Sequence, residues 1–163
     1  GETASWDMAA IEHSARIGAT EPAACGLHWT FGPMVDIARD ARWGRIMEGA
    51  GEDPHLGAQA AAARVRGFQG KDLSALDTIA ACAKHYAAYG FAEAGRDYNT
   101  VDISEQTLRN VVLPPFKAAA EAGVATFMNS FNEIAGIPAT GNAHLQRDIK
   151  DMIGITVKVT PLP

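Results

Sequence analysis

Short apolar runs alternate with helical segments along this chain, and this alternation restricts its possible folds more than any other feature. Strands that are separated by helices in the sequence run parallel and are joined by right-handed crossovers. Runs typical of buried strands occupy residues 27–31, 78–83, 124–128 and 155–159. The sequence therefore predicts an α/β fold with about four parallel strand–helix units.

Helices are predicted between these runs, each beginning at a side chain that can accept a hydrogen bond from the first free backbone N–H groups. The expected N-caps are Ser5, Asp53, Ser104 and Asn142. Pro54 suits the first position of the second helix, whereas Pro114-Pro115 should break and restart the third helix. The fourth helix is expected to bury the face made of Leu145, Ile149 and Met152.

The length of the chain and the position of its polar segments narrow the fold further. The chain has 163 residues, whereas a complete eight-fold strand–helix barrel needs about 250. Polar, glycine-rich segments follow the strands and precede the helices, which is where ligands bind in barrels and in open parallel sheets. No phosphate loop or G-x-G-x-x-G motif is present, so a nucleotide-binding sheet is the weaker alternative. We expect a partial (β/α)8 TIM-type barrel.

Composition argues against several kinds of partner. The net charge is -5 with acids and bases interspersed, so no basic face predicts nucleic-acid binding. No apolar run approaches the about 18 residues of a membrane span, and no signal peptide is visible at the N-terminus. Cys25 and Cys82 are expected to be buried free thiols. The histidines lack metal-ligand spacing, so neither a metal nor a cofactor is predicted.

The densest group of charged residues lies in the long loop at residues 36–53. This loop holds four acids, three arginines and a tryptophan ahead of the capping Asp53. For most of these side chains a structural salt-bridge network is the simpler interpretation. Arg45 ends the basic series beside Gly44, and a guanidinium held by acids is a good two-pronged donor to adjacent hydroxyls. We expect Arg45 to face a ligand pocket.

Two further groups of polar residues are expected where strands end. Lys84 and His85 follow an apolar strand, and packing does not explain them; together they offer several hydrogen-bond donors to ligand oxygens. Phe131 lies between Asn129 and Asn132 after the next strand, where it can stack on the apolar face of a ring. A purely structural role for the two asparagines, which would tie down the loop, is an equal alternative.

These segments together resemble the barrel domain of glycoside hydrolase family 3, especially bacterial β-glucosidases. The resemblance reaches to about residue 154, and its motifs agree in order and spacing. They are residues 29–33 (WTFGP), 34–45 (MVDIARDARWGR), 48–54 (EGAGEDP), 84–90 (KHYAAYG), 95–102 (GRDYNTVD), 129–132 (NSFN) and 136–140 (GIPAT). The resemblance implies that residues 1–163 are a fragment of the N-terminal barrel domain, without its early strands and without the α/β domain that follows it.

The resemblance also implies roles for single residues. Arg45, Lys84 and His85 correspond to residues that hold the hydroxyls of the terminal non-reducing sugar, and Phe131 lies near the sugar ring. The β-N-acetylglucosaminidase branch carries an Asp-Ser-His element after its Lys-His strand, and residues 95–100 lack it. A β-glucosidase is therefore expected, with β-xylosidase as the alternative. Bacterial relatives are often periplasmic or secreted, which leaves the compartment of this chain open.

Relatives use a retaining mechanism, in which a carboxylate attacks the anomeric carbon and a carboxylic acid protonates the leaving oxygen. The nucleophile of the family is an aspartate after a serine at the end of a late strand. Here the corresponding residues are Lys158 and Val159, and valine cannot form a glycosyl ester. The family's acid belongs to the separate domain. No catalytic residue is therefore assigned, and the chain alone is expected to be inactive.

Two alternatives remain open. The chain can serve as a non-catalytic sugar-binding or assembly module that takes glucose or a β-glucoside weakly. Alternatively, two of the acids Glu48, Glu52, Asp97 and Asp102 could form a retaining pair about 5 Å apart. The second alternative is much the weaker, because all four acids fit structural roles in the family.

Parallel strands cut from a closed barrel leave open edges, which pair readily with other chains. We therefore predict that the 163-residue polypeptide forms homo-oligomers through these edges, exchanges strands between copies or dissolves poorly. Sedimentation of the purified chain should show assemblies larger than one copy. A stable, well-folded monomer would contradict this expectation.

Overall fold

Among the described residues, three parallel strands form the main sheet, and their order follows the chain. The computed structural model describes residues 1–154 and the backbone of residues 159–160. Strands β1 (Cys82–Tyr86), β2 (Thr126–Asn129) and β5 (Val159–Thr160) are neighbours in that order. Since no strand order is reversed, the arrangement is that of a barrel segment and lacks the switch point of a nucleotide-binding sheet. The α/β prediction with parallel strands is confirmed.

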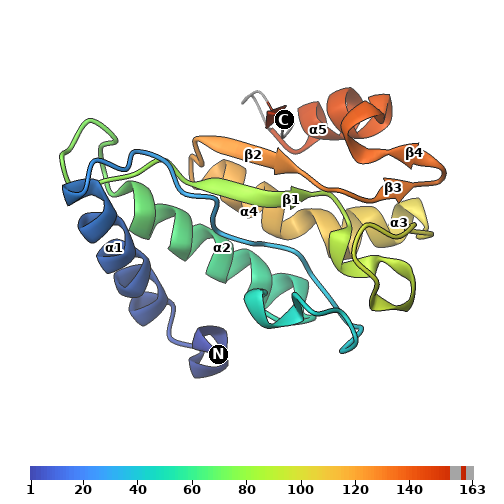
Figure 1. The fold of residues 1–163 in the computed structure, drawn as a ribbon, viewed down its shortest axis with the longest axis horizontal. Helices are drawn as coiled ribbons and strands as arrows, with labels where there is room; N and C mark the ends of the chain where they lie inside the picture. The colour runs from blue at the N-terminus through green and yellow to red at the C-terminus, as the bar shows by residue number, and fades with distance from the viewer. Residues whose placement is uncertain (155–158, 161–163) are drawn as a thin grey trace.

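The predicted strand at residues 27–31 is wrong as a regular strand, although the segment does run parallel to β1. It forms one bridge between Trp29 and Ala80, and the pairing continues to a second bridge between Met34 and Lys84. Pro33 lies between these bridges and has no N–H group to donate, so a continuous ladder cannot form. Figure 1 shows this segment as the blue chain that lies beside β1.

The other strand predictions are confirmed with shifted bounds. The predicted strand at 78–83 begins later, at Cys82, and runs on through Lys84 and His85, which therefore belong to the strand. Most of the predicted run at 155–159 lies outside the described residues, but Val159 pairs with Phe127. A two-stranded antiparallel hairpin, β3 (Glu133–Ile134) with β4 (Ile137–Pro138), follows β2.

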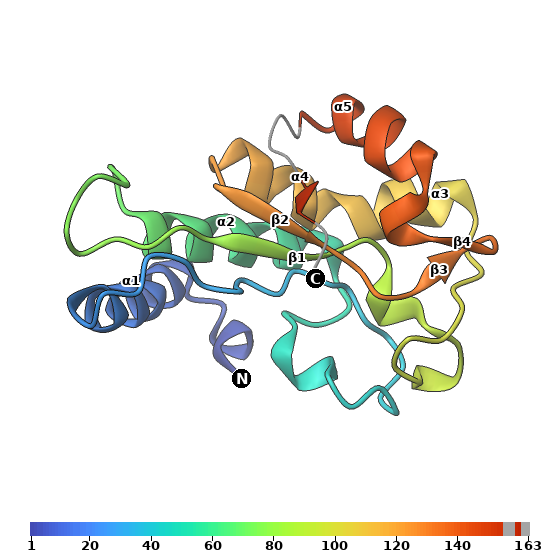
Figure 2. The same cartoon turned by 45° about the horizontal axis from the view of Figure 1, so that its top comes forward.

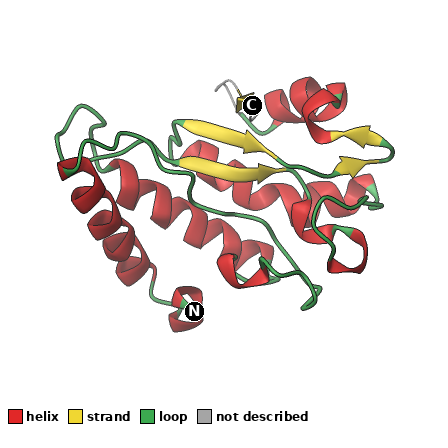
Figure 3. Ribbon diagram, in the orientation of Figure 1, coloured by secondary structure: helices red, strands yellow, loops and turns green. Residues whose placement is uncertain are grey.

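Helices α1 (Met8–Ala24), α2 (Pro54–Gln69) and α4 (Leu113–Glu121) lie side by side along one face of the sheet (Figures 1 and 3). The main core lies between α4 and the strands. There Tyr86 packs edge-on against Phe116, with the ring centroids 5.4 Å apart, and both rings neighbour Phe127. No helix among the described residues is long and apolar enough to cross a membrane.

The buried side chain of Gln69 fastens the starts of two strands. Its Oε1 accepts the backbone N–H groups of Ala81 at 3.1 Å and Ala125 at 2.8 Å, and its Nε2 donates to the Gly123 carbonyl at 2.9 Å. Both polar atoms of the side chain are thus bonded to backbone groups, as burial requires. One glutamine at the end of α2 thereby sets the entry of both β1 and β2 into the sheet.

The helix caps agree with the sequence in three of four cases. Asp53, Ser104 and Asn142 accept the predicted backbone hydrogen bonds at helix starts. Ser5 does not: it ends a 3-10 turn (Glu2–Ser5), and Asp7 caps α1 by accepting the N–H of Ala10 at 2.9 Å. An aspartate two residues along is an equally good cap, so local sequence did not separate the two positions.

Pro114-Pro115 does not break its helix, contrary to the prediction. The helical path runs from α3 (Glu105–Thr107) through a π-helical turn (Leu108–Val112) directly into α4. The prolines fall within the first turn of α4, where a missing N–H costs little. The π-helical turn before them already departs from the α-helical hydrogen-bond pattern, so the helix accommodates the prolines without a break.

Cys25 and Met152 were both predicted to be buried, and both predictions are wrong. Cys25 is exposed, whereas Cys82 is buried as expected. The C-terminal helical segment, a π-helical turn (His144–Ile149) followed by α5 (Lys150–Met152), buries Leu145 and Ile149 but leaves Met152 53% exposed. The π-helical turn changes the angle between successive residues, so the expected 3.6-residue spacing no longer places Met152 on the buried face.

Two helical glycines give a matched test of the contact between α1 and α2. A Cβ atom on Gly67 would overlap the Glu12 carbonyl and the Ala15 side chain, whereas one on Gly18 would make only an ordinary 3.7 Å contact with Phe68. We predict that Gly67→Ala destabilises the fold by about 1–3 kcal/mol through this overlap. Gly18→Ala should stabilise it by up to about 1 kcal/mol through helix propensity. Urea unfolding of both variants measures the difference, and equal stabilities would contradict the close crossing.

Candidate functional site

The candidate site lies where β1 and β2 end and two long loops meet. The loop at residues 36–53 follows the segment beside β1, and the loop at residues 87–104 follows β1 itself. Both loops lie at the same end of the sheet in Figures 1 and 2. In a parallel barrel this end, the carboxyl end of the strands, is where ligands bind. The four residues singled out from the sequence, Arg45, Lys84, His85 and Phe131, come together here.

His85 is held by a buried acid that the sequence did not single out. The Asp36 side chain is 98% or more buried, and its Oδ2 accepts both the backbone N–H of His85 at 3.0 Å and its Nδ1–H at 2.9 Å. The pairing of β1 with β2 skips His85, since Lys84 pairs with Met128 and Tyr86 with Asn129. Such a bulge redirects a side chain, and here it turns the imidazole toward Asp36.

Arg45 is held in a two-pronged ion pair, as its neighbourhood in the sequence suggested. Its Nε lies 2.7 Å from Glu48 Oε1 and its Nη2 lies 2.9 Å from Glu48 Oε2. The remaining nitrogen, Nη1, lies 3.3 Å from His85 Nε2, and the guanidinium covers the Tyr89 ring at 5.8 Å. Hydrogen bonds from Arg45 lower the pKa of the Glu48 carboxyl. Arg45 therefore reaches the site as predicted, with its orientation fixed by Glu48.

Lys84 is half-buried beside this pair. Burial lowers the pKa of its ammonium, the positive charge of Arg45 lowers it further, and Glu48 partly opposes both effects. An ammonium in this setting lacks full hydration and gains more from a ligand oxygen than an exposed lysine would. Lys84, His85 and Arg45 thus form one group of neighbouring polar side chains, as expected from the sequence.

Aromatic rings form the other side of the group. Phe131 is half-buried and packs against His85 and Tyr89, each at 5.4 Å between centroids, and against Tyr98 at 5.2 Å. Tyr89 also meets the edge of the buried Trp43 at 5.2 Å. Burial and the nearby Asp97 carboxylate raise the pKa of the Tyr89 hydroxyl. The rings offer an apolar surface beside the polar group, which suits a ligand with both kinds of face.

The two loops are locked together by close backbone contacts. A Cβ atom on Gly90 would overlap the Ile37 carbonyl, and Gly95, with a φ of 65°, packs against the backbone of Trp43. The indole of Trp43 donates to Asp97 Oδ1 at 2.6 Å. Asp97 and Glu48, two of the four acids weighed as an alternative catalytic pair, therefore have structural partners already.

The asparagines around Phe131 support the loop, which is the structural alternative considered for them. Asn129 Oδ1 accepts from Gln146 at 2.9 Å, and Asn132 Nδ2 donates to the Ala87 carbonyl at 3.3 Å. Both side chains line a depression of about 250 Å³ together with Phe131, Pro138 and Thr140. Asn132 Oδ1 is buried and has no hydrogen-bond partner among the residues that the structure describes.

The sequence missed two residues of the site, Asp36 and Tyr89. Asp36 stood among the acids of a charged loop, but a distinguishing signal was present: it follows the buried Met34-Val35 and precedes Ile37-Ala38, so it is an isolated acid within an apolar run. Such an acid needs a buried partner. Tyr89 carried no comparable signal, because its ring is placed by Trp43 and Phe131 from distant parts of the chain.

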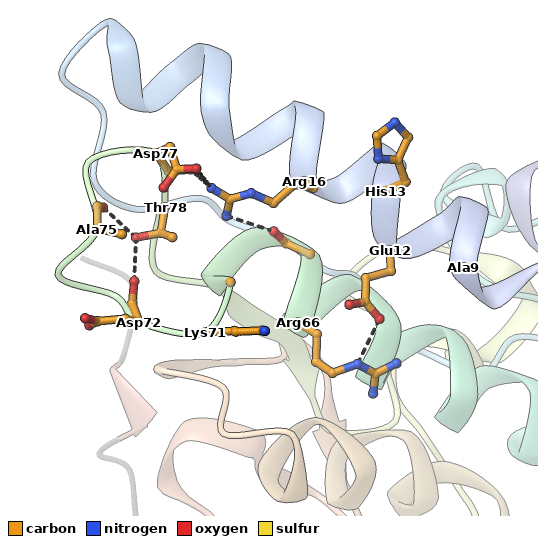
Figure 4. Close-up of a pocket in the computed structure, with 12 residues that line it drawn as sticks. Ala9, Glu12, His13, Arg16, Arg66, Lys71, Asp72, Ala75, Asp77 and Thr78 are labelled. Atoms are coloured by element: carbon orange, nitrogen blue, oxygen red, sulfur yellow. Dashed lines mark hydrogen bonds and ion pairs between the residues drawn. The ribbon is translucent and has the colours of Figure 1, made fainter.

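A groove larger than this depression lies elsewhere in the described part of the chain. It measures about 760 Å³ and runs between α1, the end of α2 and the loop that precedes β1 (Figure 4). Ion pairs of Arg16 with Asp77 and of Arg66 with Glu12 cross it. This groove borders the amino ends of the strands, a face that serves stability in barrels, and none of the site residues line it.

The ion pair of Glu48 with Arg45 generates a pH-dependent prediction. Because folding lowers the pKa of Glu48 below the ordinary value of about 4.3, its contribution to stability is present above that value and is lost as the pH falls through the lower folded pKa. We expect Glu48→Gln to cost up to about 1 kcal/mol at pH 7, since the pair is partly exposed. This cost should shrink toward zero below pH 4.

Urea unfolding of wild type and variant at several pH values measures this difference. Glu52→Gln is the matched control, because Glu52 is exposed in the same loop and forms no ion pair with another described residue. It should change stability by less than about 0.5 kcal/mol. A Glu48→Gln cost that stays constant with pH would rule out the ion pair as its cause.

Comparison with known proteins places this geometry in a family. A model of the glycosyl hydrolase family 3 N terminal domain matches residues 1–154. A periplasmic beta-glucosidase of Salmonella typhimurium is 41% identical over 149 residues, which cover 91% of this chain and 20% of that protein. A beta-xylosidase of Formosa agariphila is 37% identical over 155 residues, covering 92% and 21%. The chain thus spans about a fifth of the length of the curated relatives that it matches.

Solved structures agree with these sequence relatives. A beta-glucosidase from Listeria innocua in complex with glucose has a TM-score of 0.93 and 42% identity, over 98% of this chain and 23% of that one. The same enzyme has also been solved, as a mutant, in complex with laminaribiose. The fold is therefore that of a partial TIM-type barrel, as predicted. With the family model matching nearly the whole described chain, this protein belongs to glycosyl hydrolase family 3.

Proposed function

We propose that this chain supplies the sugar-holding wall of a β-glucosidase-type glycoside hydrolase. The observation that carries the proposal is the convergence of Arg45, Lys84 and His85 beside the Phe131 ring at the carboxyl ends of the strands. The proposed ligand is the terminal non-reducing β-glucosyl unit of a β-glucoside. Residues 1–163 would then form part of the N-terminal barrel domain.

The chemistry of the cluster suits a sugar. A hydroxyl both donates and accepts hydrogen bonds, and the site offers cationic donors in Lys84 and Arg45 and an acceptor in Glu48. The apolar face of a pyranose ring needs a flat apolar partner, which Phe131 provides. Two cations and two carboxylates also balance in charge here, so the site favours a neutral ligand over an anion.

We propose that the chain binds sugar without cleaving it. A retaining glycosidase needs a carboxylate at the anomeric carbon and a carboxylic acid on the other side. Val159 occupies the position where the family resemblance expects the nucleophile. The acids nearest the cluster are engaged, since Asp36 binds His85 and Glu48 binds Arg45. The reaction therefore requires carboxylates from polypeptide outside residues 1–163.

A chimeric enzyme tests this proposal most directly. Residues 1–154 would replace the matching part of the Listeria innocua beta-glucosidase, which is 42% identical and nearly superimposable. We predict that the chimera hydrolyses an aryl β-glucoside, because these residues would rebuild the sugar-holding wall. Lys84→Ala or Arg45→Ala should lower kcat/KM at least about tenfold, the effect of losing one charge-assisted hydrogen bond.

Arg42→Ala is the matched control, since Arg42 lies in the same loop but points to Asp40 at the surface. It should leave hydrolysis unchanged. Activity on an aryl β-xyloside that exceeds activity on the glucoside would favour the β-xylosidase alternative. A folded chimera that neither binds glucose nor hydrolyses either substrate would refute the proposal. Robust hydrolysis by residues 1–163 alone would refute the inactive-chain part of it.

A further inference from the structure

His85 is the one buried histidine among the five of this chain, and its contacts determine which ring nitrogen carries a proton. His13, His28, His55 and His144 are exposed, whereas His85 is 1% exposed. It contacts a carboxylate through one ring nitrogen and a guanidinium through the other. One contact requires a hydrogen-bond donor on the ring and the other requires an acceptor, so together they select one protonation pattern.

The Asp36 carboxylate can only accept hydrogen bonds, so at 2.9 Å the imidazole Nδ1 must carry a proton. The Arg45 guanidinium can only donate, so at 3.3 Å the imidazole Nε2 must carry a lone pair. One ring arrangement meets both conditions, the neutral imidazole with its proton on Nδ1. Asp36 Oδ2 also accepts the backbone N–H of His85 at 3.0 Å, which holds the carboxylate beside Nδ1, and turning the ring over would lose both ring contacts.

We propose that Asp36 is a positioning residue, which keeps the proton of His85 on Nδ1 and so makes Nε2 a hydrogen-bond acceptor toward the ligand. The inference rests on the proposed function, because the ligand is taken to be a sugar. Because Nε2 has one lone pair, a ligand hydroxyl would displace Arg45 Nη1 from it, donate its own proton to Nε2 and accept hydrogen bonds from Lys84 or from the displaced Nη1. The site would thus recognise one hydroxyl as both donor and acceptor, which an ammonium, a donor only, or a carboxylate, an acceptor only, could not match.

A merely structural role for Asp36 is the competing explanation, since a buried carboxylate with hydrogen-bond partners also stabilises the fold. The two explanations differ in what they predict for the ring of His85. A structural role requires only that something fill the space and accept the backbone N–H. The positioning role requires that removal of the acceptor release the proton from Nδ1, even in a chain that remains folded.

Long-range proton–nitrogen correlation spectra of the ¹⁵N-labelled full chain distinguish the two ring patterns, and His85→Gln identifies the His85 signals. At neutral to slightly basic pH, wild type should show His85 with its proton on Nδ1 and an unprotonated Nε2. His13, His28 and His55 are exposed and should show averaged signals. In Asp36→Ala the His85 pattern should become mixed or move to the Nε2–H form, and glucose affinity should fall about tenfold.

Asp36→Asn keeps an acceptor oxygen and should restore the Nδ1–H pattern, whereas Asp40→Ala, in the same loop, should change neither the pattern nor glucose binding. Wild-type His85 with its proton on Nε2 would overturn the proposal, and it needs no variant to be seen. A folded Asp36→Ala chain with an unchanged His85 pattern would also overturn it. A wild type with the expected ring pattern but a flat glucose titration would instead refute the proposed function, and with it the role assigned to the ligand hydroxyl.

Discussion

The buried carboxylate of Asp36 joins two parts of the chain that are 49 residues apart, and the candidate site depends on this junction. Asp36 follows the segment beside β1, whereas His85 is a buried residue next to the end of β1 itself. A buried carboxylate is costly unless it is hydrogen-bonded, so this acid can be accommodated only where β1 presents both a ring N–H and a backbone N–H. The loop that carries Arg45 therefore begins at a fixed point, beside Lys84 and His85.

The junction of Asp36 with His85 also determines how the charged side chains of the site are arranged. Glu48 holds Arg45 against His85, and Lys84 lies close enough for the Arg45 charge to lower its pKa. The Glu48 carboxylate pairs with Arg45 and also partly opposes the effect of the Arg45 charge on Lys84, so the neighbouring positive charges are tolerated without an external anion. The glycines at 90 and 95 let the second loop approach the first closely enough to complete this group. The close packing of the two loops and the charges of Arg45, Lys84 and Glu48 therefore shape the same part of the site.

Much of this arrangement could be predicted from the sequence, because local signals agreed with the final fold. The capping residues Asp53, Ser104 and Asn142 and the alternation of strands and helices follow from short-range patterns. The convergence of Arg45 with Lys84 and His85, by contrast, was implied only by the family resemblance. The errors arose where an irregular helical turn, which the residue pattern did not reveal, changes the course of a helix. Pro114-Pro115 continue a helix because a π-helical turn precedes them, and Met152 is exposed for the same kind of reason.

The proposed function separates sugar binding from sugar cleavage along the barrel. In that proposal the donors to sugar hydroxyls come from β1, which carries Lys84 and His85, and from the loop after the neighbouring segment, which carries Arg45. Attack on the anomeric carbon needs a carboxylate that is free of such partners, since a carboxylate held by a guanidinium or an imidazole is a weaker nucleophile. Asp36 and Glu48 are committed to holding the donors. In the proposed function, a chain that uses its nearest acids in this way takes its nucleophile from another strand, and the position that the family resemblance implies for that nucleophile holds Val159.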